Sequence, residues 1–129
     1  MNRALAKELK DAAFPMPAYR AGHKFYPPEQ GGDWSDAARQ NGVTITAYDL
    51  EERLQDIENG YYCPNLSDLV EACAGSFSRL SVLKALWAAE SDNPPLTVWG
   101  DSPEEAVARL WLALNGFKSA ASRSSVQGA

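Results

Sequence analysis

Two cysteines and one histidine are the residues of this chain whose side chains could act as nucleophile, base or soft metal ligand. The cysteines are Cys63 and Cys73, and His23 lies forty residues before the first of them. A thiol beside an imidazole can act as a nucleophile, and the two partners need not be close in sequence. Cys63 with His23 therefore supports the hypothesis of a small hydrolase. We prefer a structural thiol and a surface histidine, because His23 lies in a stretch rich in glycine and proline.

These three side chains do not have the spacing of a metal centre. Neither cysteine belongs to a Cys-x-x-Cys pair, and there is no second histidine to complete a zinc site. We therefore expect no metal, no cofactor and two free thiols. Cys73 fits the apolar stripe of a predicted helix, where a thiol acts as a small apolar side chain.

Paired carboxylates are abundant, but their positions do not indicate acid–base catalysis. Such catalysis needs two carboxyl groups in different environments inside a cleft. The pairs in this chain fall on helix faces that we predict to be exposed, or at the start of a helix. We therefore expect no enzyme. The pairs are Glu51 with Glu52, Asp56 with Glu58, and Glu104 with Glu105.

The composition is that of an ordinary globular domain. The 129 residues include 12 basic and 17 acidic side chains, a net charge of −5, and 45% of the residues are apolar. Phosphate contacts need clustered lysine and arginine, so we expect no direct nucleic-acid binding. Charges interrupt the N-terminus, and no apolar run reaches the ~18 residues of a membrane span. We therefore expect a cytoplasmic protein without membrane contact.

Acidic residues are concentrated in the middle of the chain. Residues 49–105 contain three basic and twelve acidic side chains, whereas residues 106–129 contain three basic and none acidic. The block either keeps the protein soluble or attracts a basic partner. One form of the second hypothesis is an inhibitor that occupies the nucleic-acid-binding site of a host defence protein.

Apolar periodicity and capping residues predict four helices. Thr46 with Asp49, Asn65, and Ser102 with Glu105 have the spacing of helix N-caps, and the last is the strongest start signal. Trp111 falls on the apolar stripe of the last helix and is predicted to be buried. The four helices are expected over residues 3–13, 46–59, 65–74 and 102–114.

Strand signals are weaker than helix signals in this chain. Residues 43–45 and 96–99 fit short strands, whereas residues 77–90 fit either a helix or a strand. Residues 15–45 contain many prolines and glycines and predict an irregular arm. Residues 118–129 are rich in serine and alanine, lack periodicity, and predict a flexible tail.

The helix after Thr46 offers a candidate surface for a partner. On a helical wheel Leu50, Leu54 and Ile57 cluster on the side that we expect to be buried. Tyr48, Glu52 and Asp56 lie opposite and predict a partner-binding face, since tyrosine is common at binding hot spots and acids steer basic partners. In the alternative interpretation Tyr48 folds back beneath the first turn and the acids only solvate the helix.

Three segments in order resemble those of small uncharacterised phage and prophage proteins: residues 5–12, 62–73 and 102–114. The resemblance implies an α/β sandwich, in which helices pack on a small antiparallel sheet. It also implies a β-hairpin over the ambiguous residues 77–90. It implies no activity, and residues 15–60 have no counterpart in it.

We therefore expect a single α+β domain over residues 1–117, described as an α/β sandwich, with an irregular N-terminal arm or insertion at 15–45 and a tail at 118–129. The leading functional hypothesis is a non-enzymatic phage-type accessory protein, in the host cytoplasm, that binds another protein of the host or the phage. The acidic inhibitor and the Cys63–His23 hydrolase are the alternatives. The sequence leaves the oligomeric state open.

Overall fold

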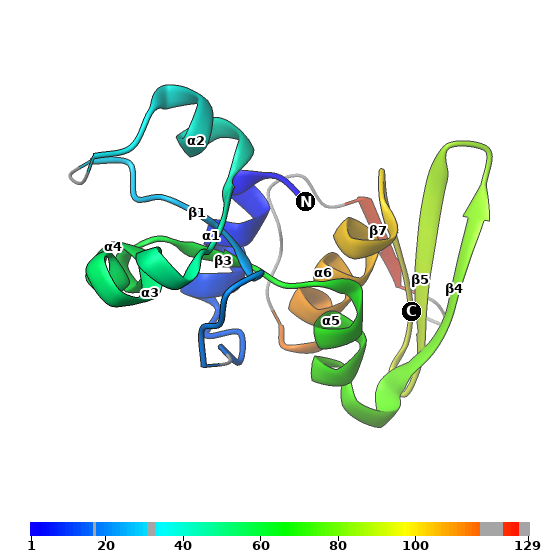
Figure 1. Ribbon diagram of the computed structural model, residues 1–129. Helices are drawn as coiled ribbons and strands as arrows, with labels where there is room; N and C mark the ends of the chain where they lie inside the picture. Colours follow the sequence, from blue (N-terminus) through cyan, green and yellow to red (C-terminus); the bar gives the residue numbers. More distant parts are fainter. Residues whose placement is uncertain (17, 31–32, 117–122, 127–129) are drawn as a thin grey trace. The chain divides into compact units, whose positions relative to one another are not determined.

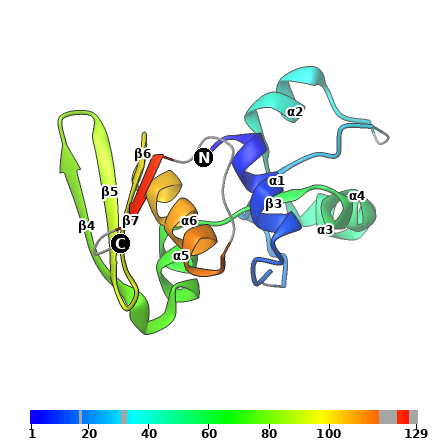
Figure 2. The same cartoon turned by 180° about the vertical axis from the view of Figure 1, so that it is seen from behind.

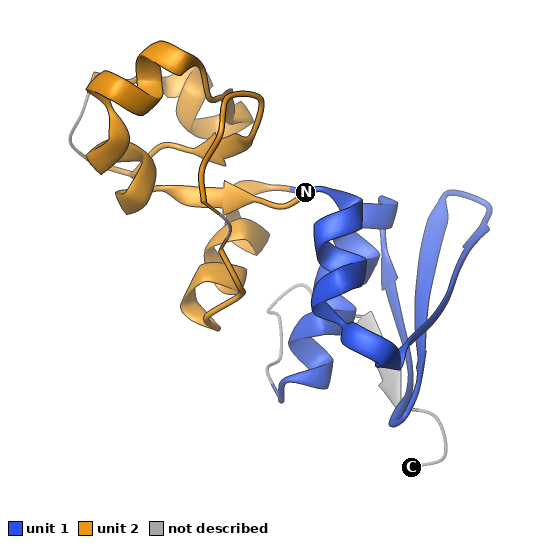
Figure 3. Cartoon of the chain, turned by 60° about the horizontal axis from the view of Figure 1, so that its bottom comes forward, with its two compact units in different colours: residues 1, 65–129 blue, residues 2–64 orange. Residues whose placement is uncertain are grey.

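The computed structural model describes residues 1–16, 18–30, 33–116 and 123–126, which have an α+β fold (Figure 1). The chain forms two compact units, one of residues 2–64 and one of residues 65–129 together with Met1 (Figure 3). We call them the N-terminal and C-terminal units. Each has its own antiparallel sheet, whereas the sequence predicted one sheet in a single domain over residues 1–117.

The N-terminal unit has a three-stranded sheet in the order β2-β1-β3. Phe25 of the central strand pairs with Val43 on one side and with Tyr62 on the other, both antiparallel. The elements of this unit are α1 (Arg3–Asp11), β1 (Lys24–Tyr26), α2 (Asp36–Asn41), β2 (Val43–Thr44), α3 (Ala47–Glu52), α4 (Leu54–Asn59) and β3 (Tyr61–Cys63).

The stretch 15–45, predicted to be an irregular arm, contains the central strand of this sheet. The three residues of this strand are too few for a periodic pattern, whereas the short strand predicted over residues 43–45 is present as β2. The arm also supplies much of the core: Phe25 and Ile45 are buried against Ile57. Tyr19, Trp34, Val43 and Leu50 pack around them. Pro17 and residues 31–32 of this prediction lie outside the described part of the chain.

The helix predicted over residues 46–59 is two helices that meet at Arg53. Thr46 and Asp49 form the expected capping box at its start. Arg53 has φ −130° and ψ 23°, which interrupts the helical rotation between α3 and α4. Leu54 is consequently 42% exposed and not buried as predicted, whereas Ile57 is fully buried.

The C-terminal unit has a four-stranded antiparallel sheet in the order β4-β5-β6-β7. The ambiguous residues 77–90 form most of the β4–β5 hairpin, as the resemblance implied. Residues 123–126 of the predicted tail form β7, and residues 118–122 and 127–129 lie outside the described part. The elements are α5 (Leu66–Ala72), a 3₁₀ turn (Ala74–Ser76), β4 (Phe77–Leu83), β5 (Leu86–Asp92), β6 (Pro95–Gly100), α6 (Pro103–Leu114) and β7 (Arg123–Val126).

Helix α6 packs on one face of this sheet, and α5 packs on α6 (Figures 1 and 2). Gly100 of β6 faces the helix so closely that a Cβ there would lie 2.6 Å from the Ala106 nitrogen. Cys73 and Trp111 are buried, as predicted. The predicted N-caps Asn65 and Ser102 accept hydrogen bonds from the backbone N–H groups three residues on. The opposite face of the sheet is covered by none of the described helices of this unit.

Candidate functional site

The structure does not assemble the Cys63–His23 dyad. Cys63 of β3 is paired with Lys24, and directly paired residues point to the same face of a sheet. His23 precedes Lys24 and points to the other face, where its ring contacts Tyr62 with 5.4 Å between ring centres. Its Nδ1 accepts a hydrogen bond of 3.2 Å from the Arg20 N–H. The imidazole is therefore held by its own loop and lies across the sheet from the thiol.

The second thiol is buried in the C-terminal unit. Burial raises the pKa of Cys73 from 9.0 to about 11, so the group is a protonated thiol at neutral pH and a poor nucleophile. Neither cysteine forms a disulfide. Within the described ranges no group of three or more histidine, cysteine or acidic side chains could hold a metal ion.

The carboxylate pair at the start of α6 has a structural role. Glu105 is buried and forms an ion pair with Arg109 one turn along the helix. Glu105 also accepts a hydrogen bond of 3.2 Å from the Asp101 N–H, and Arg109 donates one of 3.3 Å to the Trp99 carbonyl. Together these interactions tie α6 to the end of β6, and they leave Glu105 no free oxygen aimed at a cleft.

The three residues of the predicted partner-binding face lie on two helices. Tyr48 and Glu52 are exposed on α3, whereas Asp56 is half-buried on α4. Asp56 accepts a hydrogen bond of 3.1 Å from the Trp34 indole N–H. The Arg53 guanidinium lies over the Trp34 ring, 4.6 Å from its centre, and 5.9 Å from the Tyr48 ring centre. Asp56 and Tyr48 are thus engaged within their own unit, and the binding role of this face stays a prediction.

A surface that the sequence reasoning missed lies where β4 turns into β5. Leu83 pairs with Leu86, so Lys84 and Ala85 form a two-residue turn. The two residues before the turn are exposed although both are apolar: Val82 by 52% and Leu83 by 65%. We call Val82, Leu83, Lys84, Ala85, Leu86 and Trp99 the hairpin end.

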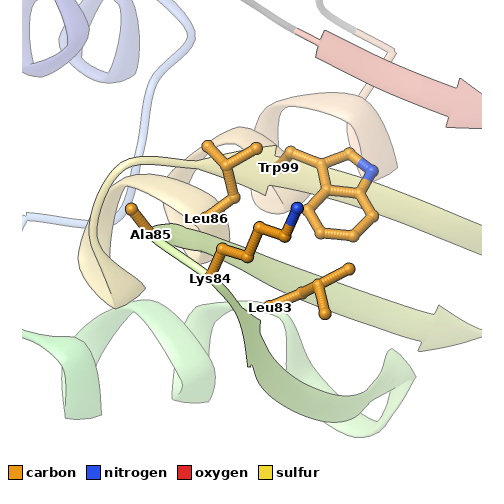
Figure 4. A pocket seen from close by; sticks show the side chains of 5 residues that line it. All are labelled: Leu83, Lys84, Ala85, Leu86 and Trp99. Carbon is orange, nitrogen blue, oxygen red and sulfur yellow. The ribbon is translucent and has the colours of Figure 1, made fainter.

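A pocket of about 510 Å³ opens at the hairpin end (Figure 4). Leu83 is paired with Leu86, and Trp99 with Ala88, so the three large side chains share one face of the sheet. Gly100, the neighbour of Trp99, faces α6, so this is the face that α6 does not cover. The lining is apolar apart from one ammonium group and consists of Leu83, Lys84, Ala85, Leu86 and Trp99.

Strand β4 is an edge of the sheet, and its two halves differ. The first half has an irregular register between Phe77 and Arg79, and Arg79 forms an ion pair of 2.8 Å with Glu90. Bulges and charges of this kind protect edge strands from pairing with other chains. The second half, Leu80–Leu83, pairs regularly with β5 and carries no charge. In the described part of the chain no strand pairs with its outer edge, so this half could pair with a further strand.

A signal for this surface was present in the sequence. Val82 and Leu83 are adjacent, and adjacent residues of a strand point to opposite faces of the sheet. Both can be buried only if the strand is covered on both faces. Once residues 77–90 are assigned to a hairpin, an apolar pair beside its turn indicates a surface that is available to another molecule.

Comparison of the chain with protein-family models, with curated proteins and with solved structures finds no match. The resemblance to small phage proteins therefore stays a prediction. No helix of the described residues is long and apolar enough to cross a membrane.

Proposed function

We propose that this protein acts without catalysis and binds another protein through the hairpin end. The observation that carries the proposal is the exposure of Leu83 beside an apolar pocket on the sheet face that α6 does not cover, with Val82 exposed on the opposite face of the same strand end. Contiguous exposed apolar surface of this kind is typical of interaction sites. A tryptophan in the wall of such a pocket is also typical of binding hot spots.

The chemistry of the pocket supports binding in preference to catalysis. Of the five lining residues only Lys84 is titratable, and none is a nucleophile with a base beside it. The hairpin end carries a cation and no carboxylate, which favours a general protein-binding role over an acidic mimic of nucleic acid. The proposal includes a phage-type accessory role for the protein and a location in the cytoplasm of the host.

Quantitative capture with the full chain tests this function. Wild-type protein, a Val82→Thr/Leu83→Thr double variant and a Tyr48→Ala control would each be immobilised and exposed to extract of the source cells. Threonine is polar and has the β-branched shape that strands favour, and Tyr48 is exposed to a similar extent as Leu83 but lies in the other unit. Melting curves would confirm that all three proteins are folded.

We expect at least one protein to be captured equally by the wild type and the Tyr48→Ala control, and in about 10-fold smaller amount by the double variant. After purification, this protein should bind the three variants with affinities in the same ratios. Capture that is unchanged in the double variant would contradict the proposal. Equal losses in the double variant and the Tyr48→Ala control would also contradict it, because the loss would then not be specific to the hairpin end.

A further inference from the structure

Lys84 is the one charged residue of the hairpin end, and its backbone is strained. Its φ is +56°, a value that side chains with a Cβ rarely adopt and that glycine adopts readily. In two-residue hairpin turns this position is usually glycine, asparagine or aspartate. Strained backbone that persists at a surface is often found where a side chain is needed for function.

The ammonium group of Lys84 has no ion-pair partner in the described part of the chain. The group lines an otherwise apolar pocket, so a carboxylate of a bound molecule would meet it beside apolar surface, where screening by water is reduced. The charge therefore fits a ligand that combines an apolar group with an acidic one.

The second half of β4, Leu80–Leu83, favours a ligand with an extended backbone. Leu80–Leu83 leads directly into the pocket, because Leu83 belongs to both the strand and the pocket wall. An extended peptide that pairs with an edge strand gains backbone hydrogen bonds, and alternate side chains of the peptide then reach pockets on one face. The bulge and ion pair at Phe77–Arg79 would confine this pairing to the half nearest the turn.

We infer that the hairpin end receives an extended segment of the partner in which an apolar residue and an acidic residue stand two positions apart, so that both side chains lie on the face of the pocket. The segment pairs with Leu80–Leu83, its apolar side chain enters the pocket against Leu86 and Trp99, and its carboxylate pairs with Lys84. This inference rests on the proposed function and adds to it the chemistry of the partner.

A second copy of this chain fits the same edge less well. Strand β4 reads Phe-Ser-Arg-Leu-Ser-Val-Leu, so it has no acidic residue to offer to Lys84. Its one charge is the positive Arg79, which is already paired with Glu90. Charge complementarity therefore favours a different, acidic segment over edge-to-edge pairing of two copies.

Titrations of the isotope-labelled full chain followed by NMR test the inference. The probes are capped heptapeptides of sequence Thr-Val-Thr-X-Thr-Glu-Val, in which X is leucine, isoleucine, methionine, phenylalanine or tryptophan and the glutamate lies on the same face as X. A matched set has lysine in place of glutamate. We expect at least one glutamate peptide to shift the backbone signals of Leu80–Leu86 and the indole signal of Trp99, and to bind about 5-fold more tightly than its lysine partner.

Two variants of Lys84 serve as controls. Lys84→Glu should reverse the preference between the glutamate and lysine peptides. Lys84→Gly should abolish the preference without lowering the melting temperature, because glycine accepts the positive φ of the turn. An unchanged preference in both variants would contradict the role of Lys84.

The inference would be overturned if no glutamate peptide bound at millimolar concentration, or if both sets bound equally. Concentration-dependent dimers in sedimentation, with β4 signals that shift without peptide, would identify a second copy as the occupant and would also overturn it. If the peptides fail while cellular capture still depends on Val82 and Leu83, only this inference is wrong. If capture does not depend on them, the proposed function is wrong as well.

Discussion

The two units expose large side chains to a similar extent, but they differ in what those side chains touch. Tyr48 of the N-terminal unit is 61% exposed and Leu83 of the C-terminal unit is 65% exposed. The Tyr48 ring has the Arg53 guanidinium nearby, and Arg53 in turn covers Trp34. Leu83 lies instead beside a pocket on an uncovered sheet face. Exposure alone therefore does not identify a binding surface, and the presence or absence of an internal partner is the better guide.

The difference follows from how each unit closes its core. Around Phe25, short strands and short helices leave room for long side chains to fold over the aromatic rings. The C-terminal unit places its longest helix on one face of a four-stranded sheet. Among the described residues of this unit, no helix covers the other face and no strand pairs with the outer edge of β4, so apolar residues there stay exposed.

The largest expected effects concern the separate cores. Trp111→Ala and Phe25→Ala should each lower the free energy of unfolding by about 3–5 kcal/mol, because each leaves a cavity where a buried ring was. Unfolding in urea followed by NMR would report which unit loses stability. We expect each variant to weaken its own unit more than the other. Equal losses in both units would contradict separate cores.

A smaller effect is expected for the hydrogen bond that holds Trp34. Asp56→Ala should lower the free energy of unfolding by about 1–2 kcal/mol, because it leaves the half-buried indole N–H without its acceptor. Asp56→Asn keeps an oxygen acceptor at this position and should cost clearly less. Equal stability of both variants and the wild type, measured by urea unfolding, would show that Asp56 is free to act in binding.

The two cysteines should differ in reactivity. Cys73 is buried with a pKa of about 11, whereas Cys63 is only half-buried. We expect an alkylating reagent at pH 8 to modify Cys63 in the folded protein and to leave Cys73 unmodified until the protein unfolds. Peptide mass spectrometry after timed labelling measures both rates. Rapid labelling of Cys73 would contradict its place in the core.

The same pKa predicts a loss of stability at high pH. The Cys73 pKa is raised on folding, so the folded state favours the protonated thiol. Its contribution to stability is fully present below the unfolded value of 9.0 and is lost as pH rises toward 11. Unfolding free energies measured between pH 8 and 11 should therefore fall less steeply in a Cys73→Ala variant than in the wild type.

Local signals in the sequence predicted the parts of the fold that depend on local chemistry. Thr46, Asn65 and Ser102 cap helices because a side-chain oxygen needs only the next turn of backbone. The burial of Trp111 followed from helical periodicity alone. Strand β1 has no periodic signal because it has only three residues, and its central place in the sheet is fixed by partners from distant parts of the chain.

The candidate site could be predicted only in part for a related reason. The helical wheel for Tyr48, Glu52 and Asp56 assumed one continuous helix, and the backbone of Arg53 breaks it. The hairpin end depends on β4 being an edge strand and on α6 covering the opposite face. Both are properties of the packed unit, which neither periodicity nor capping residues report.

The central claim is that the partner binds at the hairpin end, and the Tyr48 surface is the competing prediction. Calorimetric titration of the captured partner against the Val82→Thr/Leu83→Thr and Tyr48→Ala variants tests this claim most directly. The double variant should weaken binding about 10-fold and change the free energy of unfolding by no more than about 0.5 kcal/mol, because the lost side-chain surface is exposed in the free protein. Tyr48→Ala should leave the affinity unchanged. Wild-type affinity in the double variant, or loss of affinity in Tyr48→Ala alone, would contradict the account.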